Sequence, residues 1–179
     1  MKKLIFTTVI VFSAILFSHA QQKGDIAINV GADLGLPIGD FGNGFDMGYG
    51  GTVKGLYSLN EQGQIGVTLG YMSFGVKNTG SSGVNASMGV IPIFAVYRHA
   101  IGNLYLEPQV GISMNKVKVN GMSGFGGMSA SSSGLGYAVG AGYMINAFDI
   151  SVRYQAFSQS GSSSGFAGVR LAYNFALGR

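Results

Sequence analysis

The alternation of apolar with small or polar residues along most of the chain is the feature that most limits its fold. A period of two residues is typical of a β-strand whose two faces meet different surroundings, and it does not fit an amphipathic helix. The clearest example opposes two sets of side chains over residues 25–35: Ile26, Ile28, Val30, Ala32 and Leu34 against Asn29, Gly31 and Asp33. The sequence therefore predicts strands that each have one apolar face.

Eight such segments are separated by clusters of Gly, Ser and Asn, at about residues 25–35, 47–59, 64–76, 88–99, 104–117, 135–145, 149–157 and 165–175. Their connections alternate between short ones, at 60–63, 100–103 and 146–148, and longer ones, at 37–46, 77–87, 118–134 and 158–164. An even strand number lets a meander close with both ends at one rim, and short turns opposite long loops are the layout of outer-membrane barrels. We therefore predict an all-β fold, an eight-stranded antiparallel up-and-down transmembrane β-barrel with its long loops outside the cell.

The direction of the apolar faces separates a membrane barrel from a soluble one. In a membrane barrel the apolar faces point to lipid, and tyrosines gather where the lipid meets water. The lipid face predicted here has tyrosines at both edges: Tyr49, Tyr71 and Tyr137 toward the loops, and Tyr57, Tyr97, Tyr143 and Tyr173 toward the turns. A soluble, lipocalin-like barrel is the alternative, and it predicts apolar faces that point inward.

The segment 88–99 is apolar on both faces, so its orientation is set by its one charged residue. We expect Arg98 to point inward, since a charge in lipid is costly. The same register then places Ile91, Ile93, Ala95 and Tyr97 outward.

The first twenty residues are typical of a secretory signal peptide. Lys2 and Lys3 precede an apolar run over residues 4–17, and small residues stand before Gln21 at the positions that a signal peptidase reads. We expect cleavage before Gln21, which leaves residues 21–179 as one barrel domain. Removing Lys2 and Lys3 lowers the formal net charge from +4 to +2. The remaining basic residues are scattered, which disfavours a nucleic-acid partner.

Charged residues on the predicted inner faces are expected to form a network in the lumen, because a charge in a low-dielectric interior needs a partner. Strand neighbours place Asp33 between Lys54 and Arg170, and place Glu107 and Arg153 at similar heights. Such a network is either a gate or selective pore, or a polar core that fills a barrel too narrow for a channel. We favour the polar core.

The sequence shows no combination of residues that is typical of a catalytic site. The chain after residue 20 has a single histidine, His99, in a predicted turn on the periplasmic side, and the serine runs at 131–133 and 162–164 have no base beside them. Without cysteine a thiolate metal site is excluded. We predict no enzymatic activity, no cofactor and no metal. The apolar residues of the longest loop are instead the candidates for surface contacts: Met122, Phe125 and Met128.

Four short segments match motifs of a known family: Leu36–Gly42, Ile91–Ile93, Gly140–Tyr143 and Arg153–Tyr154. Through them the sequence resembles the outer-membrane β-barrel domain proteins common in Bacteroidota and, more distantly, the small OmpX-like and OmpA-like barrels. The resemblance implies residence in the outer-membrane lipid and insertion by the barrel-insertion machinery through the last strand. The exposed apolar residues of the longest loop, rather than the resemblance, are the reason to expect a surface ligand.

Two functions remain open at this stage. The first is a structural or surface-interaction barrel, and the second is a narrow transport channel for small solutes. Large side chains across the barrel axis would favour the first, and a continuous water path would favour the second.

Overall fold

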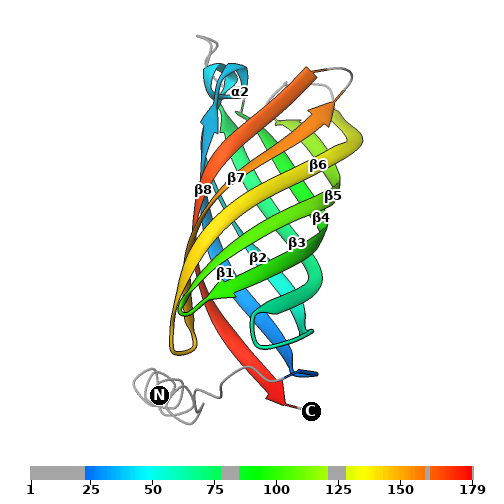
Figure 1. The fold of residues 1–179 in the computed structure, drawn as a ribbon. Helices are drawn as coiled ribbons and strands as arrows, with labels where there is room; N and C mark the ends of the chain where they lie inside the picture. The colour runs from blue at the N-terminus through cyan, green and yellow to red at the C-terminus, as the bar shows by residue number, and fades with distance from the viewer. Residues whose placement is uncertain (1–22, 78–84, 121–127, 160–161, 179) are drawn as a thin grey trace, which may run out of the picture.

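The computed structural model describes residues 23–77, 85–120, 128–159 and 162–178. These residues form a closed barrel in which every strand is antiparallel to the next and β1 pairs with β8 (Figure 1). The strands are β1 (Ile26–Ile38), β2 (Phe45–Ser58), β3 (Gly63–Val76), β4 (Asn85–Ile101), β5 (Leu104–Asn120), β6 (Met128–Ile145), β7 (Phe148–Gln159) and β8 (Ser162–Gly178). The predicted fold, an eight-stranded up-and-down barrel, is confirmed.

The two rims of the barrel differ. At the turn rim, two-residue connections join β4 to β5 and β6 to β7, and the start of β1 pairs with the end of β8. The loop rim carries the short helix α2 (Asp40–Gly44), at the end of the barrel opposite the C-terminus (Figure 1). No helix among the described residues is long and apolar enough to cross a membrane.

Several strands extend further toward the loop rim than the sequence predicts. β5 continues to Asn120 and β6 begins at Met128, so the predicted loop 118–134 is reduced to residues 121–127. Ser131–Ser133 and Ser162–Ser164, expected in loops, lie within β6 and β8. The apolar pattern ends where lipid ends, but a strand pair continues in water because its backbone hydrogen bonds need no apolar face. The predicted connection 37–46 contains α2, between the end of β1 at Ile38 and the start of β2 at Phe45.

The predicted facing of the strands is confirmed. Val110 and Val152, expected toward lipid, are 53% and 57% exposed, whereas Asn29 and Gln109 are buried in the interior. In β4, Ile93 lies outward and Arg98 inward, as expected from the charge alone. The polar interior and apolar outer surface are the reverse of a soluble lipocalin-like barrel.

Candidate functional site

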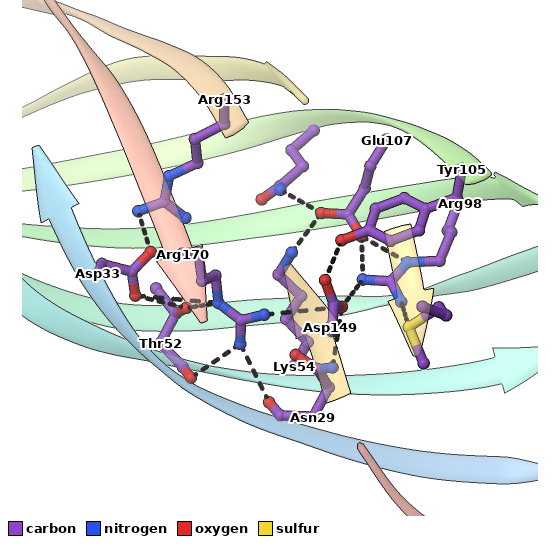
Figure 2. Close-up of polar contacts among 12 residues, drawn as sticks. Asn29, Asp33, Thr52, Lys54, Arg98, Tyr105, Glu107, Asp149, Arg153 and Arg170 are labelled. Carbon is purple, nitrogen blue, oxygen red and sulfur yellow. Dashed lines mark hydrogen bonds and ion pairs between the residues drawn. The ribbon is translucent and has the colours of Figure 1, made fainter. Parts of the chain in front are cut away.

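The lumen is the part of the molecule where polar and charged side chains gather, and it contains three layers. Near the loop rim lies an apolar cluster of Phe41, Met72, Phe74, Met88, Val90, Phe157 and Phe166. A small apolar cluster of Ala27, Leu56 and Val96 lies toward the turn rim. The third layer lies below the apolar cluster of the loop rim, where charged residues from six strands form a connected network (Figure 2).

Glu107 is the first acidic centre of this network. Its carboxylate pairs with the ammonium group of Lys54 and accepts a hydrogen bond of 2.7 Å from Arg98 Nε. Gln109 Nε2 donates to the same carboxylate at 2.8 Å. Arg98 reaches it from the neighbouring strand β4 and Lys54 from β2, so this carboxylate on β5 links β2 to β5 across β3 and β4.

Asp149, at the start of β7, is the second acidic centre. Its carboxylate accepts hydrogen bonds from the Tyr105 hydroxyl and, at 3.1 Å each, from Arg98 Nη2 and Asn29 Nδ2. The Arg98 guanidinium also lies over the Tyr105 ring, 3.8 Å from its centroid. Arg98 thus bridges Glu107 and Asp149 (Figure 2).

Asp33 on β1 is the third acidic centre and lies closer to the loop rim. Arg153 Nη2 is 3.1 Å from one carboxylate oxygen, and the Thr52 hydroxyl donates to the other at 2.9 Å. Arg170 lies 3.9 Å from Asp33 and donates from Nε to Thr52 Oγ1 at 2.6 Å. Its Nη1 is 3.9 Å from Asp149, which links the third centre to the second.

The five predicted lumen residues are all buried, but their partners differ in part from those expected. The register pairs Asp33 with Arg170 as predicted, whereas Lys54 lies opposite Asn29, so its expected place beside Asp33 is wrong. Glu107 and Arg153 share Gly140 of β6 as their register partner, yet each forms ion pairs elsewhere.

Two essential members were missing from the predicted network: Arg98 and Asp149. Both could have been found from the two-residue period. Arg98 was already assigned inward, and Asp149 precedes the outward-facing Ile150. Among the described residues, the network then contains three carboxylates and four cations: Asp33, Glu107 and Asp149 with Lys54, Arg98, Arg153 and Arg170.

The inner face of β6 is built from small residues, which makes room for large side chains of other strands. A Cβ atom at Gly142 would lie 2.3 Å from the Tyr105 ring, and one at Gly136 would lie 2.7 Å from the Phe94 ring. The run of glycines that the sequence places on this face therefore makes room for the Tyr105 and Phe94 rings.

At the loop rim, α2 closes the barrel with an aromatic side chain. Phe41 is 4% exposed, and its ring centroid lies 4.6 Å from that of Phe45, 5.1 Å from that of Phe74 and 5.6 Å from that of Phe157. The backbone carbonyl of Gly42 accepts a hydrogen bond from Lys77 Nζ, which fastens the helix to the end of β3. No pattern in the sequence predicts this plug, since Phe41 and Phe45 stand in a glycine-rich loop without periodicity.

The remaining candidate residues lie outside this network. Met122 and Phe125 fall outside the described residues, and Met128 is the first residue of β6, not part of a loop tip as expected. His99 lies on β4 near the turn rim, with Nδ1 3.4 Å from the Tyr97 hydroxyl. Within the described ranges, no group of His, Asp or Glu is arranged to hold a metal ion.

Comparison with known proteins identifies the family. The outer membrane protein beta-barrel domain family matches residues 8–176. The chain belongs to this family. No curated protein matches it in sequence. The protein is thus a member of an outer-membrane barrel family and lies in the lipid of the cell outer membrane.

Solved structures of outer-membrane proteins share the fold. Ail, the attachment invasion locus protein of Yersinia pestis, solved with the heparin analogue sucrose octasulfate, superposes with a TM-score of 0.65 at 17% identity, covering 86% of this chain and all of Ail. Neisserial surface protein A gives 0.54 at 15% identity, covering 86% of this chain and 97% of that protein. The N-terminal barrel domain of Pseudomonas aeruginosa OprF gives 0.53 at 13% identity, covering 87% of this chain and all of that domain. At these identities the likeness concerns the fold.

Proposed function

We propose that this protein is a structural or surface-interaction barrel whose lumen is filled by side chains and whose recognition lies on its extracellular loops. The observation that carries the proposal is the occupancy of the lumen. Eight strands enclose an interior that side chains can fill. Here Arg170, Phe74 and Phe94 are fully buried.

The ion pairs of the network support a closed lumen because they cross it. Lys54 and Glu107 come from β2 and β5, which are separated by two strands on one side of the barrel and four on the other. Above them, the aromatic rings around Phe41 occupy the end near the loop rim. A solute would have to displace both layers to pass.

The proposed role includes no catalysis. His99 lies near the turn rim. Chemistry on external substrates would take place at the opposite, extracellular end of the barrel. The proposal places recognition on the loop rim, where Met122 and Phe125 are the apolar residues of the connection 121–127. Ail, with its bound heparin analogue, is a precedent for ligand binding by a barrel of this fold.

Biogenesis follows from the same proposal. Residues 1–20 would direct export and be removed before Gln21, and the last strand, with Tyr173 and Phe175, would be read by the barrel-insertion machinery. On the motifs that resemble Bacteroidota barrel domains, we propose a source in that group.

A swelling assay separates this role from the alternative, a narrow transport channel. Proteoliposomes containing the wild-type barrel should swell in arabinose or glycine no faster than empty liposomes. A general porin in matched liposomes serves as the positive control. Swelling that rises with the amount of folded barrel would replace the proposal by the channel.

The outside position of the loops is tested on intact cells. An epitope inserted between Gly124 and Phe125 should bind antibody on intact cells, whereas the same epitope between Gly102 and Asn103 should require permeabilised cells. The reverse result would place recognition on the other rim.

A further inference from the structure

Two lysines are the exception to an outer surface that is otherwise uncharged over most of the barrel. Lys116 and Lys118 lie on the outward face of β5 near the loop rim and are both exposed. Among the described residues of β3 to β8, no other Lys or Arg lies on the outward face. Their position therefore requires an explanation of its own.

The length of the apolar face of β5 places these lysines at the edge of the lipid. Outward residues are apolar from Leu104 to Met114, and Leu104, Val110 and Met114 are 56%, 53% and 44% exposed. Ten residue steps of about 3.4 Å on a strand tilted by about 40° span roughly 25 Å, the height of the apolar band of an outer-membrane barrel. Lys116 is the next outward residue, so it lies at the level of the outer-leaflet headgroups.

The surroundings of the two lysines are rich in hydrogen-bond donors. Lys116 lies opposite Ser131 of β6 and Gly89 of β4, and Lys118 lies opposite Ser129 and Ser87. On an antiparallel pair, such opposite side chains are about 5 Å apart. The ring of Tyr71 lies against Gly89, where a Cβ atom would be 3.0 Å from it, so an interfacial tyrosine flanks Lys116.

This chain has no carboxylate that could neutralise the pair. After Glu61 the sequence contains only two acidic residues, Glu107 and Asp149, and both are buried in the lumen network. Asp40 and Asp46 lie at the loop rim beside β1 and β2, on the opposite side of the barrel from β5. An anion that pairs with Lys116 and Lys118 must therefore come from outside the chain.

We propose that Lys116 and Lys118, with the serines opposite them, form a binding site for the phosphate groups of an anionic glycolipid in the outer leaflet. Lysine binds phosphate as a point charge and reaches headgroups from an apolar surface by extending along it. Serine hydroxyls donate to the remaining phosphate oxygens. A lipid headgroup fits better than a soluble anion because the site continues directly from the lipid-facing surface below Met114.

Native mass spectrometry of the purified barrel tests the site. Diphosphoryl lipid A and its dephosphorylated form are titrated against the wild type and the variant Lys116→Gln/Lys118→Gln. Since each cation near an anionic surface contributes about a fivefold preference, the double variant should bind diphosphoryl lipid A about 25-fold more weakly. Lys77→Gln is the matched control, because Lys77 lies at the same rim but donates to the Gly42 carbonyl. It should bind like the wild type.

The remaining measurements decide between the sources of phosphate. Lys116→Arg/Lys118→Arg should retain most of the affinity, and heat-modifiable migration on a gel should show that all variants fold. Inorganic phosphate and sucrose octasulfate should not displace the lipid at equal concentration. Equal binding of the two lipid A forms, or wild-type affinity in the double Gln variant, would overturn the proposal. Displacement by the soluble anions would overturn it in favour of a soluble ligand.

Discussion

The ammonium group of Lys54 on β2 pairs with the carboxylate of Glu107 on β5, across the interior of the barrel. Glu107 also pairs with Arg98, so one buried carboxylate holds two buried cations. Removing one partner of a buried ion pair lowers the stability of the fold by more than the pair contributes to it, because the remaining charge is left buried and unpaired.

Glu107→Gln should therefore destabilise the barrel more than Lys54→Met. The first change leaves the buried Lys54 without a carboxylate and Arg98 with Asp149 alone, a loss of about 3–5 kcal/mol. The second leaves Glu107 still paired with Arg98 and should cost less. Urea unfolding in lipid vesicles measures both. Thr68→Val is the control, since the buried Thr68 hydroxyl has no hydrogen-bond partner among the described residues. A larger loss for Lys54→Met would contradict this account of the network.

Neighbouring residues on β5 should lose different amounts of stability when the same charge is introduced. Val110→Arg places a cation in lipid near the bilayer midplane and should cost about 2–4 kcal/mol. Gln109→Arg places it in the polar lumen beside Glu107 and should cost less. The free energy of unfolding in vesicles gives the comparison. Similar losses at both positions would show that the two faces are wrongly assigned.

Gly142 should not tolerate even a methyl group. A Cβ atom there would meet the Tyr105 ring at 2.3 Å, which displaces the hydroxyl that donates to Asp149. Gly142→Ala should cost about 1–3 kcal/mol, as is usual for overpacking. Gly55→Ala, with nothing within 4 Å of the added atom, should be neutral. In the Tyr105→Leu background, Gly142→Ala should lower the free energy of unfolding by much less than in the wild type. An equal loss in both backgrounds would refute the steric explanation.

The predicted signal peptide is tested by intact mass. Protein isolated from the outer membrane should begin at Gln21 and lack the first twenty residues. Ala20→Tyr, which puts a large side chain at the cleavage position, should leave precursor uncut. A mature protein that retains residues 1–20 would exclude cleavage at this site.

The two-residue period was sufficient to predict the number of strands, their facing and the tyrosines at both edges, because a lipid surface imposes that pattern on every strand. It could not predict the partners of long side chains. Arg153 pairs with Asp33, on the far side of β8, since Gly168 between them has no side chain. Such contacts depend on the stagger between strands and on side-chain conformations. The plug formed by Phe41 was missed for a similar reason, because its position depends on the path of a loop.

The central claim, that side chains close the lumen, is tested most directly by electrical recording in a planar lipid bilayer. Folded wild-type barrel should insert without stable unitary current steps. Phe41→Ala, which removes one ring of the outer cluster, should also stay closed, since the ion pairs below it remain. Reproducible steps that scale with the number of inserted wild-type barrels would contradict the account and establish a channel.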